Sequence, residues 1–473
     1  MRILQATSEF HPYSKTGGLA DMVAGLSGAL VGQGHEITVA TPLYLSILND
    51  HRSLKPYGRE FQVTLGKNVS PGRWLSTKTE SGVTVLFLEN KEFFEREGIY
   101  MENGDGYLDN PERFMFLSKA VAKLSADFDV VHVHDWQTAF VPMLLKLNPE
   151  KDNPGSMLTI HNLAYQGTCE KERFNISNLS QKHFRKKGPE FWGSLNFLKA
   201  GLHYADAITT VSPRYAKEIL TPEFGEGMDG VLRSRENDLT GVLNGVDYGE
   251  WRTIGNPHLP ADYSLEDLSG KLDCKKAVMN EMGLAECHLP LFGIVTRFAE
   301  QKGIGLLTDS IEEFLENNQL QLVVLGEGDQ LLGKRLNQIQ KKFPDLLAVQ
   351  TGYDASLAHR IEAGSDFFLM PSKFEPCGLN QMYSLRYGSI PIVHAVGGLD
   401  DTIRDETSNL GPVNGFKFHT YSIMALQSSI SSAIEVYQDT FKMHQIAKTG
   451  MEDDYSWSKS SGIYADIYQT LCK

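Results

Sequence analysis

Residues 371–381 read PSKFEPCGLNQ, and the interpretation of the whole chain starts from this stretch. It follows the apolar run 366–370, which is typical of a buried strand, and it precedes residues 379–387, which have helical composition and end at Gly388. The pattern predicts a strand-to-helix turn. In an open α/β sheet such turns lie at the carboxyl ends of the strands, where ligands bind, and the free N–H groups of the helix suit an anion.

Glu375 is unexpected in such a turn, because a carboxylate repels a phosphate. If the residue is functional, it faces something neutral or cationic, such as sugar hydroxyls or a developing positive centre. A surface glutamate that helps to cap the following helix is the structural alternative, and for a single residue it is the more common case. The choice between the two depends on the rest of the sequence.

Length and composition describe a large globular chain. The 473 residues allow about two to four domains, and 41% hydrophobic with 22% charged residues is ordinary for a globular protein. The formal charge of −14 disfavours nucleic acid and anionic membrane surfaces as partners. An anionic sugar nucleotide would need basic residues concentrated at its site.

The cysteines and the termini favour a cytoplasmic protein. The five cysteines are scattered, odd in number and without a C-x-x-C pair, which indicates neither zinc nor a redox centre. Residues 1–7 read as a strand and lack the apolar core of a signal peptide, and no downstream segment is long enough to span a membrane.

Two series of alternating strands and helices predict the fold. Residues 3–7, 19–31 and 34–42 form a βαβ unit of the doubly wound type, and a second series begins at residue 291. We expect the domain linker in the polar, proline-containing segment 251–269, with Asn244-Gly245 as its tight turn. The sequence therefore predicts an α/β protein with two nucleotide-binding-type domains that face each other across a cleft.

Several blocks of sequence resemble the bacterial glycogen synthases and plant starch synthases, which are retaining glycosyltransferases of the two-domain GT-B type. The blocks are KTGGLAD at 15–21, HNLAYQG at 161–167, VLNGVD at 242–247, QKG at 301–303, EPCGLNQ at 375–381 and GGL at 397–399. The resemblance covers nearly the whole chain. It implies an N-terminal Rossmann-like acceptor-side domain at 1–245, a nucleotide-donor domain at 246–455, and a C-terminal helix at 456–473 that crosses back onto the N-terminal domain.

The resemblance also implies which residues act. His161 would touch the transferred glucose, Arg297 and Lys302 would hold the diphosphate, and Tyr353 is a candidate to stack on the base. Independently of the resemblance, two cationic side chains on one loop suit the negative charges of a diphosphate. The expected catalytic residues are Glu375, His161, Asp135, Arg297 and Lys302. The expected donor-binding residues are Lys15, Gly17, Gly18, Tyr353, Cys377, Gly378, Leu379 and Asn380, and Asp21 is expected elsewhere in the cleft.

No cofactor or metal is expected. His132 and His134 share one face of the strand at 129–134, a spacing that permits metal ligation, but the sequence offers no third ligand nearby. Glycosyl transfer leaves negative charge on the diphosphate and positive charge on the sugar. Arg297, Lys302 and the helix end near Gly378 would stabilise the first, and Glu375 the second.

The implied reaction is transfer of glucose from ADP-glucose to the non-reducing 4-hydroxyl of an α-1,4-glucan, with retention of configuration. UDP-glucose as donor, a transferase with a small sugar acceptor, and a catalytically degenerate glycan-binding protein are the alternatives. Two departures from the family pattern stand out. Tyr383 replaces a second glutamate found in many retaining relatives, and His394 and Val396 precede Gly397-Gly398 where glycogen synthases commonly have Arg and Thr.

Overall fold

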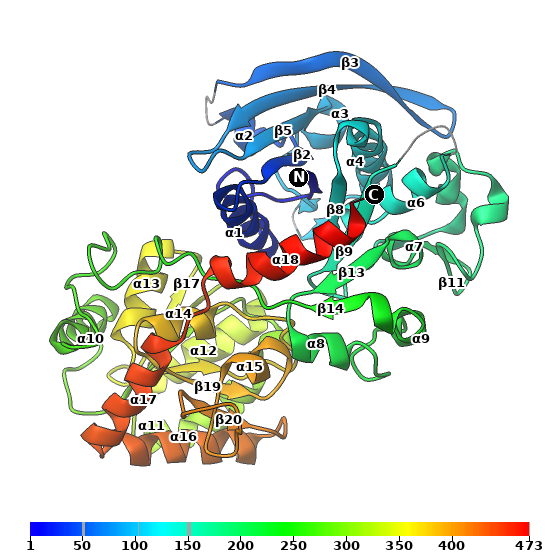
Figure 1. Cartoon of the computed structure of the whole chain (residues 1–473). Helices are drawn as coiled ribbons and strands as arrows, with labels where there is room; N and C mark the ends of the chain where they lie inside the picture. Colours follow the sequence, from blue (N-terminus) through cyan, green and yellow to red (C-terminus); the bar gives the residue numbers. More distant parts are fainter. Residues whose placement is uncertain (50–52, 103, 149–152, 473) are drawn as a thin grey trace. The chain divides into compact units, whose positions relative to one another are not determined.

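The computed structural model describes residues 1–49, 53–102, 104–148 and 153–472. The chain divides into unit 1, which comprises Met1–Gly245 and Trp457–Lys473, and unit 2, which comprises Val246–Ser456. Each unit is built around a parallel sheet that helices cover (Figure 1). The α/β fold with two Rossmann-like sheets that the sequence predicts is confirmed.

Unit 1 contains a nine-stranded sheet. Its parallel strands are β5 (Thr84–Glu89), β2 (Glu36–Pro42), β1 (Arg2–Ala6), β8 (Val130–His134), β9 (Gly155–Ile160), β13 (Ala207–Thr210) and β14 (Leu239–Gly241), in that spatial order. The antiparallel strands β4 (Asn68–Lys78) and β3 (Lys55–Leu65) extend the sheet beyond β5. The strand order reverses between β1 and β8, which makes their carboxyl ends the switch point where ligands bind in such sheets.

The helices of unit 1 follow the strands. They are α1 (Gly18–Gly32), α2 (Leu45–Asn49), α3 (Lys91–Phe94), α4 (Asn110–Leu124), α5 (Asp135–Thr138), α6 (Val141–Lys146), α7 (Phe197–Tyr204), α8 (Pro213–Glu218), α9 (Asp229–Arg233) and α18 (Trp457–Leu471). Two small antiparallel sheets complete the unit. One consists of β6 (Met101–Glu102) and β7 (Asp105–Gly106), and the other of β10 (Thr168–Cys169), β12 (Ser194–Asn196) and β11 (Glu190–Phe191).

Unit 2 contains a six-stranded parallel sheet in the Rossmann order 3-2-1-4-5-6. In space the strands are β17 (Leu347–Thr351), β16 (Gln321–Gly326), β15 (Leu291–Val295), β18 (Phe367–Met370), β19 (Ile390–His394) and β20 (Phe416–Phe418). The helices are α10 (Ser269–Met282), α11 (Ile304–Glu316), α12 (Gln330–Lys342), α13 (Ala355–Gly364), α14 (Asn380–Arg386), α15 (Gly397–Thr402), α16 (Ile423–Tyr437) and α17 (Thr440–Glu452). The switch point lies between β15 and β18.

Both faces of the unit 2 sheet are buried. Phe292 and Ile294 of β15 belong to one apolar cluster, which includes residues of α11, α12 and α16. Their neighbour Leu291 belongs to a second cluster, which includes residues of α10 and α13. Because successive side chains of a strand point to opposite faces, this alternation shows that helices cover both sides of the sheet.

The segment 251–269 is not a linker, contrary to the sequence-based expectation. The Trp251 ring stacks on Tyr383 at a centroid distance of 3.6 Å and on His359 at 4.0 Å. The Asn256 side chain donates to the Tyr387 hydroxyl at 2.9 Å. Aromatic burial and these polar contacts make the segment part of unit 2, and the chain passes from unit 1 to unit 2 after Gly245.

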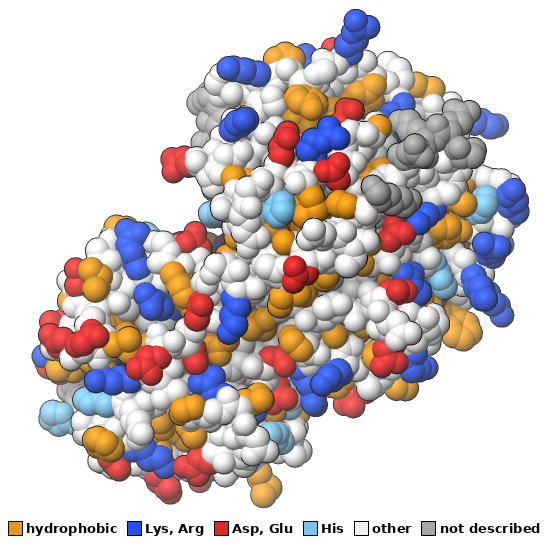
Figure 2. All heavy atoms as spheres, in the orientation of Figure 1, with side chains coloured by type: hydrophobic (Ala, Val, Ile, Leu, Met, Phe, Trp, Pro, Cys, Tyr) orange, Lys and Arg blue, Asp and Glu red, His pale blue; other side chains and the backbone are white. Residues whose placement is uncertain are grey.

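Helix α18 belongs to unit 1 although it follows unit 2 in the sequence. Its Tyr464 and Tyr468 are fully buried, whereas the adjacent Ile463 is 44% exposed. The Trp457 ring lies against Gly25 of α1, where any Cβ would clash with it. Within the described residues no helix is long and apolar enough to cross a membrane. On the face drawn in Figure 2, acidic and basic side chains are interspersed.

Candidate active site

The predicted residues of unit 1 lie at the carboxyl ends of β1, β8 and β9. The loop that carries Lys15 and Gly17 follows β1, Asp135 follows β8, and His161 follows β9. Since β1 and β8 flank the switch point of the sheet, the first two of these groups share the edge where ligands bind in doubly wound folds.

The loop between β1 and α1 already holds a carboxylate. Glu9, which is buried, accepts hydrogen bonds from the backbone N–H groups of Thr16 at 2.5 Å and Gly17 at 3.2 Å. The Thr16 hydroxyl at 2.7 Å and the Tyr100 hydroxyl at 2.6 Å donate to it as well. Nothing in the sequence marks Glu9 as a site residue. It shapes the loop by accepting from backbone N–H groups of a segment that is predicted to bind the donor.

Lys15 and Asp21 form an ion pair within the same loop and helix. The Lys15 Nζ lies 2.8 Å from Asp21 Oδ2, and His11 Nδ1 lies 3.8 Å from the other carboxylate oxygen. Asp21 is in the first turn of α1, where the helix dipole favours an acidic residue. Lys15 is 39% exposed, so its ammonium can still reach an anion in solvent.

Asp135 begins α5 with the unusual φ of +54°. Its Oδ1 accepts a hydrogen bond from the backbone N–H of His161 at 2.7 Å, so it ties the end of β8 to the end of β9. Burial raises the pKa of Asp135 to about 7, although the hydrogen bonds from the His161 and Asn162 backbones act in the opposite direction. A non-glycine residue in the left-handed region at a ligand-binding edge is typical of functional sites.

Three imidazoles gather beside Asp135. The His134 Nδ1 lies 3.1 Å from His161 Nε2, and the His132 and His134 rings are 4.0 Å apart. Burial lowers the pKa of His161 to about 3, so its imidazole is neutral at physiological pH. Nevertheless, among the described residues no group of three His, Cys, Asp or Glu side chains has the geometry to hold a metal ion.

In unit 2, Glu375 lies in the turn between β18 and α14 and is buried. Its Oε2 is 2.5 Å from the Lys302 ammonium and accepts a hydrogen bond from the Ser372 hydroxyl at 3.0 Å. Lys302 is therefore the counter-ion of Glu375 in this structure. Without this counter-ion, burying the carboxylate of Glu375 would cost several kcal/mol of folding free energy, roughly 3–5 kcal/mol.

Three glycines allow this turn to form. A Cβ on Gly303 would lie 1.9 Å from the Pro371 carbonyl oxygen, and one on Gly397 would lie 1.9 Å from the Glu375 carbonyl oxygen. Both residues also have positive φ, +71° and +46°. Gly398 approaches the Cys377 carbonyl oxygen equally closely, at 2.1 Å from its ideal Cβ. The loops after β15, β18 and β19 can therefore pack backbone to backbone around Glu375.

Arg297 differs from Lys302 in having no counter-ion among the described residues. It is exposed in the loop after β15, and within the part of the chain that the structure describes it makes no hydrogen bond or ion pair. An exposed guanidinium at the switch point suits a phosphate ligand.

The remaining predicted residues of unit 2 serve the turn or lie away from it. Cys377 is buried, Gly378 has a φ of +73°, and the Asn380 side chain donates to the Val295 carbonyl at 2.8 Å. Leu379 precedes α14 and is partly exposed. Tyr353 follows β17 and is 69% exposed, which leaves its ring available to a ligand.

The residues that depart from the family pattern pack against other parts of unit 2. Tyr383 stacks on Trp251, so it packs the segment 251–269 rather than contributing a second carboxylate. His394 Nδ1 contacts the Ser372 carbonyl at 2.8 Å and its ring stacks on Phe418. Val396 is buried just before α15.

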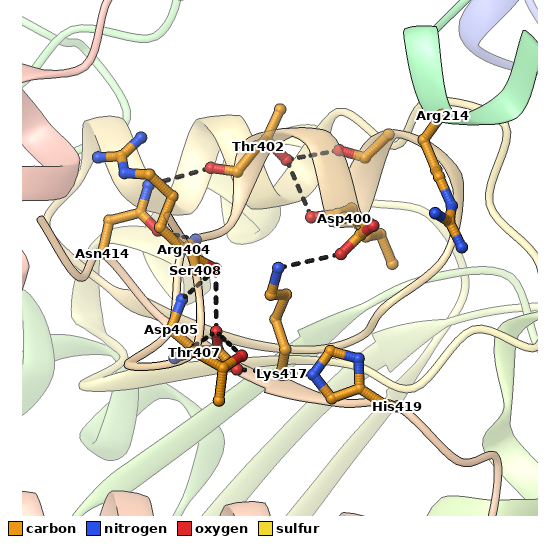
Figure 3. A network of polar contacts seen from close by, with 12 residues as sticks. Arg214, Asp400, Thr402, Arg404, Asp405, Thr407, Ser408, Asn414, Lys417 and His419 are labelled. Carbon is orange, nitrogen blue, oxygen red and sulfur yellow. Dashed lines mark hydrogen bonds and ion pairs between the residues drawn. The ribbon is translucent and has the colours of Figure 1, made fainter. Parts of the chain in front are cut away.

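A polar network that the sequence did not reveal supports α15 (Figure 3). Lys417 of β20 forms an ion pair with Asp400 at 3.0 Å. The Asn414 side chain accepts from the Arg404 backbone N–H at 2.6 Å and donates to the Thr402 carbonyl at 3.0 Å. These contacts fix the helix that begins with Gly397-Gly398, against the Glu375 turn.

Unit 1 also contains a groove of about 640 Å³. Tyr107, Trp136 and Tyr165 line it together with polar residues, which are Asn110, Gln166, Thr168, Glu170, Arg173 and Glu226. The guanidinium groups of Arg96 and Arg113 each lie over the Tyr107 ring, 4.8 Å from its centroid. Gly167 lets the Trp136 ring lie against the backbone, because its Cβ would be 2.2 Å from that ring. The rings of Tyr107 and Trp136 are therefore fixed in place.

Comparisons with known proteins agree with this arrangement. A model of the starch synthase catalytic domain matches residues 2–234, and a model of group 1 glycosyl transferases matches residues 288–450. The glycogen synthase of Anaeromyxobacter sp. strain Fw109-5 is 44% identical over 100% of this chain and 99% of its own length. That of Cellvibrio japonicus is 42% identical over 99% of both chains.

Solved structures agree as well. The catalytic domain of starch synthase IV from Arabidopsis thaliana, bound to ADP and acarbose, is 31% identical with a TM-score of 0.90 and covers 100% of this chain and 99% of that one. A sucrose-phosphate synthase from Thermosynechococcus elongatus, at 15% identity over 99% of this chain and 98% of its own, shares the fold with a TM-score of 0.63. Two Rossmann-like units with polar groups at their switch points define a glycosyltransferase of the GT-B class. The chain belongs to the glycogen synthase family.

Proposed function

We propose that the protein transfers glucose from ADP-glucose to the non-reducing 4-hydroxyl of an α-1,4-glucan with retention of configuration. The observation that carries the proposal is the set of groups at the switch point of unit 2. A buried carboxylate, its lysine partner and an exposed arginine lie there in a chain whose full-length relatives are glycogen synthases. The Arabidopsis starch synthase IV structure, with ADP and acarbose bound, supports the choice of nucleotide and of an oligosaccharide partner.

The chemistry divides between charges of opposite sign. We assign stabilisation of the leaving diphosphate to Arg297 and Lys302, and stabilisation of the positive charge that develops on the sugar to Glu375. Because Lys302 is already paired with Glu375 at 2.5 Å, Arg297 contributes the larger share of the net attraction for phosphate. The proposal needs no metal ion, and a rate that EDTA leaves unchanged would agree with it.

We assign supporting roles to unit 1. His161 and Asp135 position the sugar, since Asp135 fixes the backbone from which the His161 ring projects. Lys15 contributes positive charge to donor binding, and Asp21 orients the Lys15 side chain through their ion pair. Gly17, Gly18, Tyr353 and the residues 377–380 are proposed donor contacts or supports of donor contacts.

The groove of unit 1 is the proposed site for part of the glucan. Sugar rings present apolar C–H faces and polar edges, and the groove combines aromatic rings with hydrogen-bonding side chains. Its Arg173 is paired with Glu112 and Glu170, so the site suits a neutral ligand rather than an anion.

Tyr165→Ala should raise the KM for glycogen and leave the donor KM unchanged. Trp192→Ala, which removes an exposed aromatic ring outside the groove, is the matched control.

The decisive experiment measures initial rates with labelled ADP-glucose and UDP-glucose, each with glycogen and with a small sugar acceptor. We expect glucose incorporation into glycogen with ADP-glucose as the better donor. Transfer only to the small acceptor would point to a sucrose- or sugar-phosphate-forming enzyme, and glycogen binding without nucleotide release would point to a glycan-binding protein.

Glu375→Ala should reduce turnover by roughly 10³-fold or more while nucleotide still binds. Near-normal turnover would refute its role.

We propose a cytoplasmic location. None of the five cysteines, which all lie in the described part of the chain, forms a disulfide, as is usual for proteins of reducing compartments.

A further inference from the structure

The imidazole of His161 is held by a second imidazole. Its Nε2 lies 3.1 Å from the Nδ1 of His134, so one of the two nitrogens must carry the proton that they share. Burial lowers the pKa of both rings, that of His134 well below its usual value, so both are neutral. A neutral imidazole has one N–H donor and one bare acceptor nitrogen, and the direction of this hydrogen bond therefore fixes the tautomer of each ring.

The surroundings of His134 decide the direction. Its second nitrogen, Nε2, is buried and has no hydrogen-bond partner among the described residues. If His161 were the donor, His134 would have to carry its own proton on this buried Nε2. An orphaned buried N–H group is rarer than an unsatisfied acceptor, and leaving one costs about 1–3 kcal/mol. The alternative, in which His134 donates from Nδ1, leaves only a bare lone pair without a partner.

The His134 ring packs against a neighbour that is itself held in place. It lies 4.0 Å from the His132 ring, centroid to centroid. The His132 ring is fixed at both nitrogens, by the Tyr468 hydroxyl of α18 at 2.7 Å and by the Thr159 hydroxyl of β9 at 2.5 Å. The backbone N–H of His134 donates to the Thr138 hydroxyl at 2.9 Å. The donor nitrogen thus has one fixed direction, toward His161.

We propose that His134 is a positioning residue that donates its Nδ1–H to His161 and thereby holds His161 in the Nδ1–H tautomer, with that N–H aimed at the ligand. His161 is partly exposed, and its Nδ1 has no hydrogen-bond partner within the described part of the chain. In this tautomer the free nitrogen is a donor, which suits a sugar hydroxyl oxygen. The consequence for the reaction rests on the proposed function, but the tautomer itself does not.

The test combines a spectroscopic measurement with a pair of variants. Long-range ¹H–¹⁵N spectra of the full chain labelled at histidine distinguish a protonated from a bare ring nitrogen, and His161→Gln identifies the resonances of residue 161. We expect His161 to be protonated at Nδ1 and bare at Nε2 in the unmodified protein. Protonation at Nε2 would overturn the proposal whether or not any variant folds.

The variants ask whether the donor matters for the reaction. His134→Asn keeps an N–H group near the place of Nδ1, whereas His134→Phe keeps the ring and removes the donor. We expect His134→Phe to lower kcat/KM for the sugar nucleotide roughly tenfold, the factor for one hydrogen bond, and His134→Asn to stay within about threefold of the unmodified enzyme. Equal loss in both variants would overturn the positioning role. Should the enzyme use a different substrate, the spectra still decide the tautomer, so the two failures remain distinguishable.

Discussion

Arg297 and Lys302 both follow β15, yet the structure gives them different tasks. Lys302 neutralises a buried carboxylate, whereas Arg297 is exposed and has no partner in the described chain. We expect Arg297→Ala to leave the free energy of unfolding within about 0.5 kcal/mol of the unmodified value. Lys302→Ala should lower it by about 3 kcal/mol, because the carboxylate of Glu375 is then buried alone.

Kinetics and urea unfolding of both variants check this difference. Both should bind the donor more weakly and turn over more slowly, with the larger change in donor KM for Arg297→Ala. The double variant Lys302→Ala/Glu375→Gln should regain most of the lost stability, since a neutral amide needs no counter-ion. Equal stability of the two single variants would show that Lys302 does not balance Glu375.

Asp135 couples stability to pH. Burial raises its pKa from 3.8 to about 7, so folding favours the protonated form. This contribution to stability is complete below about pH 4 and is lost as the pH rises toward 7, at no more than about 1.4 kcal/mol per pH unit. Asp135→Asn should remove this slope and make unit 1 more stable than the unmodified protein at pH 8, because Asn tolerates the positive φ and its oxygen can accept from His161.

Unfolding by urea at pH 5 and pH 8 measures the effect. Asp105→Asn, which changes an exposed carboxylate of β7, is the control and should be neutral at both pH values. A stability difference between Asp135→Asn and the unmodified protein that does not grow with pH would contradict the argument.

At the scale of elements, two glycine-containing turns look alike in sequence but differ in what they require. An added Cβ at Gly17 would meet no atom within 4 Å, and its φ of −159° is ordinary extended backbone. An added Cβ at Gly397 would lie 1.9 Å from the Glu375 carbonyl oxygen, at a positive φ. Gly397→Ala should therefore displace the turn and lower both stability and turnover, by about 1 kcal/mol or more from the backbone alone.

Gly17→Ala provides the contrast. The free protein should unfold as before, so any loss must arise when the donor binds. Weaker donor binding with unchanged thermal unfolding would support close approach of the ligand to this backbone. Unchanged donor binding would remove Gly17 from the proposed site.

The elements themselves could be predicted because they depend on local pattern. The apolar run before residue 371 is β18, and the helix expected at 379–387 is α14 at Asn380–Arg386. The partners of the site residues could not be predicted in this way. Lys302 and Glu375 are 73 positions apart, and His134 and His161 are 27 apart, so only the order of the strands brings them together. Glu9 was missed because a lone acid after a strand gives no signal until Thr16 folds back onto it.

At the scale of the whole chain, unit 1 is completed by its last residues. Residues 1–245 form the sheet, but α18 supplies Tyr464 and Tyr468, both fully buried, and Tyr468 binds the His132 of β8. The sequence predicts a helix here, and in the structure its residue Ile463 is 44% exposed. The helical spacing alone could not tell which of two adjacent apolar residues faces the sheet.

Adjacent residues 463 and 464 therefore form a matched pair. Tyr464→Ala removes a fully buried ring and should lower the stability of unit 1 by about 3 kcal/mol or more, whereas Ile463→Ala should cost about 1 kcal/mol or less. Hydrogen exchange locates the loss. Protection in β8, β9 and α1 should fall in Tyr464→Ala, while β15 and β16 of unit 2 should exchange as before. Helix α18 follows unit 2 directly in sequence. Loss of protection in β15 and β16 instead would mean that α18 stabilises unit 2 and not unit 1.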